Sequence, residues 1–205
     1  CTNLTTAPAL SATQMARHCC DRMFEGCTAL TAAPELPATA LAEGCYCWMF
    51  WNCTGLETAP ELPATTLAEY CYEGMFEGCT GLKRAPALPA TTLTTSCYYK
   101  MFLGCTELET APELPAATLA ETCYKEMFCG CTKLNTIEVN FTSWTDADNP
   151  TLDWLKDVSA DGTFVCPEGL DISTRDESHV PAGWTVNFTS GINSPVMDSR
   201  SANGA

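Results

Sequence analysis

The clearest pattern along the chain is a set of apolar positions that returns at a fixed interval. The dipeptide Met-Phe begins at positions 23, 49, 75, 101 and 127, so that each copy lies 26 residues after the one before it. Leucine follows the same step at positions 4, 30, 56, 82, 108 and 134. A fixed period of this length is typical of stacked repeats, in which each unit buries its apolar side against its neighbours. We therefore expect these leucines and phenylalanines to form buried ladders.

Each 26-residue unit divides into two halves with different local patterns. In the first half, prolines such as Pro86 and Pro89 exclude a helix and leave room for only a brief strand. In the second half, apolar residues such as Leu67, Cys71 and Met75 are spaced four residues apart, which indicates one stripe of a helix. Capping residues precede this stretch and a glycine follows it in several units. The pattern predicts an α/β repeat solenoid of five strand-turn-helix units with a C-terminal cap.

The repeat stops after Leu134, and this divides the chain into three parts. A stretch of alternating apolar and polar residues predicts a final strand, so the solenoid is assigned to residues 1–141. Residues 142–190 hold aromatic side chains among Asp, Gly and Pro, as expected of a cap over the last repeat. Residues 191–205 are rich in Ser, Gly, Asn and Ala and predict a flexible tail. The chain begins in the middle of a unit, so we expect the natural protein to extend further at its N-terminus.

The run Met-Phe-x-Gly-Cys-Thr-x-Leu, followed by Leu-Pro-Ala-Thr, resembles the unit of the BspA-like bacterial surface leucine-rich repeats. That unit commonly reads Ala-Phe-x-x-Cys-x-x-Leu-x-x-Ile-x-Ile-Pro, and the resemblance covers roughly residues 1–140. Here the unit is longer, by about a helical turn, and it has Ala-Pro where the family has β-branched residues, so the strand should be weaker.

This resemblance implies a leucine-rich-repeat-like solenoid in a secreted or surface-anchored protein of gut or oral bacteria. Roles of that family include adhesion to host proteins, to other bacteria or to matrix. The segment between Trp154 and Trp184 also looks like the C-terminal end of such repeat proteins. Related modules in phages of these bacteria keep a fibre-tip function open.

The charge balance disfavours two classes of partner. The chain has 25 acidic and 10 basic residues, which gives a formal net charge of −15. Nucleic acid and anionic membrane surfaces both require clustered cations, so we expect neither as a partner. No apolar run approaches the roughly 20 residues that span a bilayer, so we expect no membrane insertion of this fragment. The composition fits a soluble surface of the extracellular type.

Most of the fifteen cysteines recur at repeat positions, in two columns that begin at Cys19 and Cys27. Stacked neighbours in such a column would be about 5 Å apart, which is within reach of a disulfide. Small buried thiols are also common core filler, and we favour free buried thiols over disulfides. The pairs Cys45-x-Cys47 and Cys129-x-Cys131 look like zinc half-sites, but neither has a second pair beside it.

The sequence offers no constellation typical of catalysis. His18 and His179 are the only histidines, and neither has a nucleophile at a recognisable spacing. Asp146-Ala-Asp148 lacks the glycine and distal glutamate of a calcium loop and predicts an acidic turn instead. We therefore expect no catalytic residues, no metal and no cofactor.

The candidate binding residues come from variation between repeats. Positions aligned with residues 18, 21, 22 and 25 differ from unit to unit, and on a helix they would share the face opposite the buried stripe. Drift on a solvated face would keep these positions polar, whereas a recognition surface would hold exposed aromatic side chains. The candidates on this face are Trp48, Trp51, Tyr70, Tyr99, Lys100 and Leu103. A second candidate surface is an acidic stripe, suited to a basic partner, formed by Glu35, Glu61 and Glu113, which align with Ala87.

Together these patterns predict a non-enzymatic extracellular binding or adhesion module that presents a surface built from repeats. The expected partner is a host or bacterial surface protein or a glycan. The alternatives are a phage or secreted fibre tip and a structural spacer in a larger surface protein. The sequence leaves the oligomeric state open.

Overall fold

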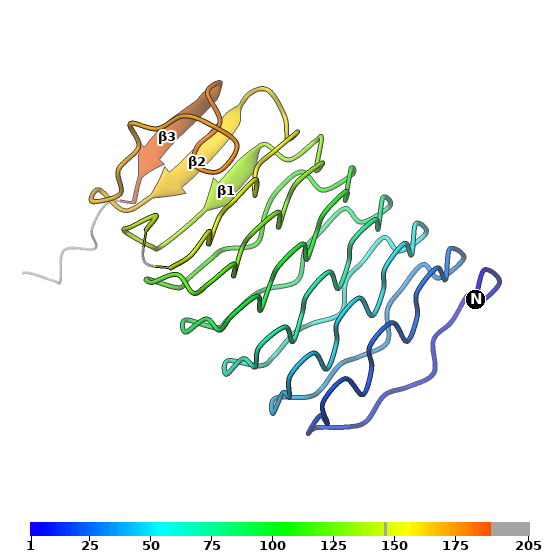
Figure 1. Cartoon of the computed structure of the whole chain (residues 1–205). Coiled ribbons are helices and arrows are strands. Elements are labelled where there is room, and N and C mark those ends of the chain that lie inside the picture. The colour runs from blue at the N-terminus through cyan, green and yellow to red at the C-terminus, as the bar shows by residue number, and fades with distance from the viewer. Residues whose placement is uncertain (146, 190–205) are drawn as a thin grey trace, which may run out of the picture.

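The computed structural model describes residues 1–145 and 147–189, and it shows a stack of layers in which each repeat forms one layer (Figure 1). The first repeat lies at one end of the stack and a small sheet lies at the other. Backbone hydrogen bonds join each layer to the next in a constant register. The predicted tail at residues 191–205, like Asp146, lies outside the described residues.

The predicted strand-turn-helix unit is wrong. The described residues contain no helix, and their only strands lie at the C-terminal end of the stack. These are β1 (Thr136–Glu138), β2 (Gly162–Cys166) and β3 (Trp184–Phe188), which form a parallel sheet in the order β1-β2-β3. The chain is therefore not an α/β repeat solenoid, although its units stack one on another.

A run of consecutive turns takes the place of the predicted helix in every repeat. One set of alternate amides bonds within the layer: the Met49 N–H donates to the Tyr46 carbonyl at 3.2 Å. The other set bonds between layers: the Phe50 N–H donates to the Met75 carbonyl at 2.9 Å. We call these runs the turn ladder, which comprises residues 16–27, 42–53, 68–79, 94–105 and 120–131.

Backbone dihedral angles explain why the turn ladder is not helical. Every fourth residue of the ladder has a positive φ, for example Gly44 at 60°, Trp48 at 48° and Asn52 at 56°. A residue of positive φ at the third position of a turn reverses the local direction of the chain, and it cannot continue a right-handed helix. The turn ladder thus repeats every four residues, close to the 3.6 residues of a helical turn. Apolar residues spaced four apart are therefore compatible with both an α-helix and the turn ladder.

The core consists of identical side chains stacked along the layers. The predicted leucine ladder is confirmed, because all five of its leucines are fully buried: Leu30, Leu56, Leu82, Leu108 and Leu134. The predicted phenylalanine ladder is confirmed as well. Its rings stack with centroids 5.4–5.6 Å apart and interplanar angles of 2–9°: Phe24, Phe50, Phe76, Phe102 and Phe128. A parallel column of tyrosines begins at Tyr46 and ends against Trp154.

All fifteen cysteines are free thiols, as expected from the sequence. Those of one column donate hydrogen bonds to the layer before them. The carbonyl of Phe50 accepts the N–H of Cys53 at 3.0 Å and also the thiol of Cys79 at 3.1 Å. The same contact recurs from Cys53, Cys105 and Cys131. Cysteine suits this position because it is small and apolar, yet it donates a weak hydrogen bond.

The first half of each unit is extended, but its layers are joined by only a few β-bridges. Neighbouring layers are joined there by isolated parallel bridges, Ala32 with Thr58 and Thr58 with Arg84. Prolines such as Pro34 lack the N–H that a longer ladder would need. Side chains alternate in this segment, so that Pro34 and Leu36 are buried whereas Glu35 is exposed. The carboxylate of each such glutamate is thereby directed outward from the stack.

Candidate functional site

The six candidate residues of the variable face are all half-buried, and they lie on the turn ladder rather than on a helix. Two of the variable positions, those aligned with residues 18 and 22, are the positions of positive φ. Trp48, Tyr70 and Lys100 occupy them at φ values of 48°, 57° and 56°. A left-handed backbone at a residue with a side chain is unfavourable by roughly 1–2 kcal/mol, so the neighbouring layers must hold it in place.

Trp48 and Trp51 are brought together beneath one arginine of the preceding layer. The guanidinium carbon of Arg22 lies 4.6 Å from the Trp48 ring centroid and 5.0 Å from that of Trp51. The indole N–H of Trp48 donates to a carboxylate oxygen of Glu77 at 3.2 Å. A cation over two indole faces is attracted by their negative ring quadrupoles. We call Arg22, Trp48, Trp51 and Glu77 the tryptophan cluster.

Packing between layers accounts for part of the variation in sequence. The side chain of Trp48 leans over Gly74 of the next layer, where a Cβ atom would collide with the indole nitrogen. His18 lies over Gly44 in the same way. At these two places the ring of one layer occupies the space that a side chain of the next layer would need, so the glycine is required there. Gly44 and Gly74 are therefore explained by packing against the preceding layer.

A second group of candidates forms around Tyr99. The ammonium groups of Lys100 and Lys125 lie 5.0 and 5.6 Å from its ring centroid, and Lys100 also pairs with Glu126 at 3.5 Å. Burial alone would lower the pKa of Lys100, but its contact with Tyr99 and the charge of Glu126 outweigh burial and raise the pKa. Leu103 lies half-buried on the same face. This group combines an aromatic ring with fixed positive charge.

The acidic candidates Glu35, Glu61 and Glu113 are exposed on the extended half of their layers. Glu35 and Glu61 line one groove of about 280 Å³, whose walls include Pro37 and Pro60. Glu113 lines a second groove of about 230 Å³, beside Ala87. The structure thus places the first two glutamates together and the third apart from them.

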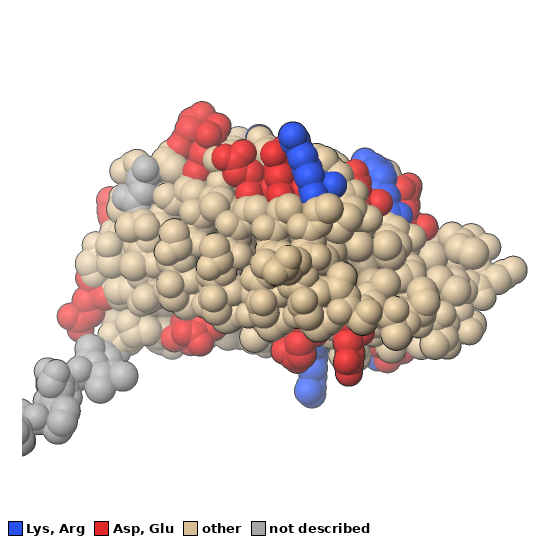
Figure 2. Space-filling view, turned by 90° about the horizontal axis from the view of Figure 1, so that it is seen from below, with Lys and Arg blue, Asp and Glu red and all other residues tan. Residues whose placement is uncertain are grey.

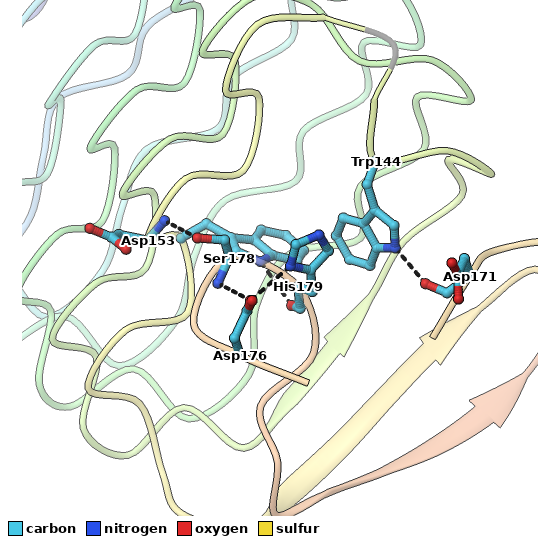
Figure 3. Close-up of polar contacts among 7 residues, drawn as sticks. Trp144, Asp153, Asp171, Asp176, Ser178 and His179 are labelled. Carbon is cyan, nitrogen blue, oxygen red and sulfur yellow. Dashed lines mark hydrogen bonds and ion pairs between the residues drawn. The ribbon is translucent and has the colours of Figure 1, made fainter. Parts of the chain in front are cut away.

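Sequence reasoning missed a polar cluster at the C-terminal end (Figure 3). Nδ1 of His179 lies 2.7 Å from a carboxylate oxygen of Asp176, which also accepts the Ser178 N–H at 2.9 Å. Burial alone would raise the pKa of Asp176, but these hydrogen bonds lower it. The His179 ring meets the edge of Trp144 at a centroid distance of 5.0 Å, beside a pocket of about 410 Å³. The spacing Asp-x-x-His is the only signal that could have indicated the cluster.

This cluster does not have the geometry of a catalytic triad. The Ser178 hydroxyl accepts the Asp153 N–H at 3.0 Å, and no hydrogen bond joins it to His179 in the described structure. A nucleophile needs such a contact with its base. Nowhere in residues 1–145 and 147–189 do three side chains of His, Cys, Asp or Glu converge as metal ligands would.

Comparison with known protein families, with curated proteins and with solved structures finds no match. The resemblance to BspA-like repeats therefore stays a prediction. A separate finding concerns membranes: in the described part of the chain, no helix is of the length and apolarity needed to cross one.

Proposed function

We propose that this chain is a non-enzymatic extracellular binding or adhesion module, and that it recognises a surface protein or glycan through the turn ladder. The observation that carries the proposal is the tryptophan cluster, in which two half-exposed indoles lie under one arginine. Tryptophan and arginine are the residues that most often dominate the energy of an interface. Tyr99 and Leu103, two layers further along the stack, would belong to the same surface.

The layered scaffold suits this function because it is already ordered. Every second amide of the turn ladder is bonded to the next layer, and the others are bonded within their own layer. Binding would therefore require little ordering of the backbone, and ordering is a large part of the free energy that association loses. An interface built on such a scaffold retains more of its contact energy.

A structural spacer is the second candidate function, and the contacts of Trp48 favour it. Its ring covers Gly74, and its N–H is bonded to Glu77, so stacking alone could account for the residue. Trp51 distinguishes the two functions better. It is half-buried, and its contact in the cluster is with Arg22 of the preceding layer.

The test is a screen of the full chain against arrays of glycans and of host and bacterial surface proteins, followed by variants. Trp51→Ser should weaken binding to the ligand so found by about thirtyfold or more, as loss of an interface anchor does. Its melting temperature should stay close to that of the wild type. Phe188→Ser, at a side chain that is 48% exposed on β3, is the matched control and should bind normally.

Two results would contradict the proposal. The first is that the screen yields no ligand for the wild-type chain. The second is that the ligand is retained by both Trp51→Ser and Trp48→Ser. Either result would leave the spacer as the function that the contacts support.

A further inference from the structure

At four places in the stack, opposite charges lie one above the other. Four ion pairs join residues that are 26 positions apart and therefore lie one above the other in consecutive layers: Arg17–Glu43, Glu57–Lys83, Lys100–Glu126 and Lys133–Glu107. The distances are 2.9 Å for Glu57–Lys83 and 2.7 Å for Lys133–Glu107. Figure 2 shows the result on one face, where acidic and basic side chains gather along both borders and the middle is largely uncharged.

The glutamates of the proline-lined groove are instead a stacked pair of like charges. Glu35 and Glu61 are also 26 positions apart, but both are acidic, and neither has an ion pair among the described residues. Carboxylates in adjacent layers are separated by about 5 Å, and at that distance like charges repel. Glu43 and Glu69 are likewise stacked, but there Arg17 pairs with Glu43. The column of Glu35 and Glu61 is thus left without a cation.

The residues that line the groove suit a cationic side chain with an aliphatic stem. Its volume is about 280 Å³, and prolines from both layers, among them Pro37, Pro60 and Pro63, form its walls. Prolines offer no N–H donor, and none of the residues that line the groove has a cationic side chain. An apolar wall beside a carboxylate suits a side chain with an aliphatic stem and a cationic head.

We propose that this groove binds an arginine side chain from an extended basic segment of a partner protein. A guanidinium has a planar fork of five donors and can reach both carboxylates, whereas the compact ammonium of lysine cannot span them as well. The groove beside Ala87 has one carboxylate, from Glu113, and it binds arginine more weakly. This surface belongs to the extended half of the layers, so the inference goes beyond the function proposed for the turn ladder.

The probe is a fluorescein-labelled peptide in which arginines alternate with prolines, which keep it extended. Its fluorescence anisotropy is measured as the protein is added. Two control peptides are titrated in the same way, one with lysine and one with the neutral isostere citrulline in place of each arginine. We expect the arginine peptide to bind most tightly and the citrulline peptide not to bind. The double variant Glu35→Gln/Glu61→Gln should weaken binding by about five- to thirtyfold, as loss of two charged contacts would.

Two further variants make the test specific to the groove. Glu69→Gln/Glu121→Gln removes the same net charge from exposed glutamates elsewhere and should leave binding unchanged. Ala87→Glu completes the column with a fourth carboxylate and should strengthen binding. Equal binding of arginine and citrulline peptides, or equal losses in the two double variants, would overturn the proposal. Neither result bears on the turn ladder, which is tested by Trp51→Ser.

Discussion

Between pH 8 and pH 10 the free energy of unfolding is expected to fall by at least about 5 kcal/mol, because buried thiols stay protonated in the folded protein. Burial raises the pKa of Cys45 and Cys53 from 9.0 to about 11, and that of Cys97 and Cys123 to about 12. In the unfolded chain the same thiols ionise near pH 9. Above that pH the unfolded state holds fewer protons than the folded state, so stability decreases as pH rises.

These four thiols set the lower bound, and other buried thiols such as Cys71 and Cys79, whose pKa is also raised by burial, add to it. Each one removes about 1.4 kcal/mol per pH unit between its unfolded and its folded pKa. The effect of the four together is comparable to the roughly 5–15 kcal/mol that holds a whole domain folded. Burial also raises the pKa of Tyr98 and Tyr124 well above 10, so their contribution has the same sign at higher pH.

Urea unfolding under reducing conditions at pH 8 and pH 10 measures the effect. Cys97→Ala removes one of the titrating thiols and should reduce the difference between the two pH values by about 1.4 kcal/mol. A free energy of unfolding that is equal at both pH values would show that the thiols are accessible to water in the folded chain.

Phe76→Ala should lower the free energy of unfolding by about 3–5 kcal/mol. The Phe76 ring is fully buried, and its centroid lies 5.6 Å from those of both Phe50 and Phe102. Its removal leaves a cavity in the middle of the column, where rigid layers on both sides cannot close it. Denaturant unfolding at neutral pH gives the value.

Phe188→Ala is the control for this prediction. Phe188 lies on β3 and is 48% exposed, so its loss should lower the free energy of unfolding by less than about 1 kcal/mol. A loss at Phe76 as small as that at Phe188 would contradict the stacked column.

The 26-residue step was enough to predict the order and spacing of the core. A column of identical residues, such as that of Leu82, stacks in any architecture that repeats each unit in register. The sequence also predicted free thiols, because Cys79 and its equivalents lie among apolar neighbours. These predictions depend on the period alone and not on the local conformation within a unit.

The local conformation could not be predicted because its signal was hidden. Glycine would mark each position of positive φ, but Trp48, Tyr70 and Lys100 occupy several of these positions and so conceal their spacing. The stacked layers hold these side chains in a conformation that their intrinsic preferences oppose. Four-residue apolar spacing was then interpreted as helical.

The candidate site was predictable only as far as it followed the repeat. The period alone placed Glu35 beside Glu61. Trp48 and Trp51 were placed on one face by assuming a helix, and the structure brings them together on the turn ladder instead. The period could not show that Arg22 covers both indoles, since that depends on side-chain direction at a residue of positive φ. The pair of Asp176 and His179 lies outside the repeats, so no period indicated it.

The most direct test of the turn ladder is the scalar coupling across hydrogen bonds, measured by NMR on the chain labelled with ¹⁵N and ¹³C. The Phe76 N–H donates to the Met101 carbonyl of the next layer at 2.9 Å. We therefore expect the Phe76 amide nitrogen to couple to the carbonyl carbon of Met101. In an α-helix the same amide would bond four residues back, and a coupling to the carbonyl carbon of Tyr72 would contradict the stacked turns.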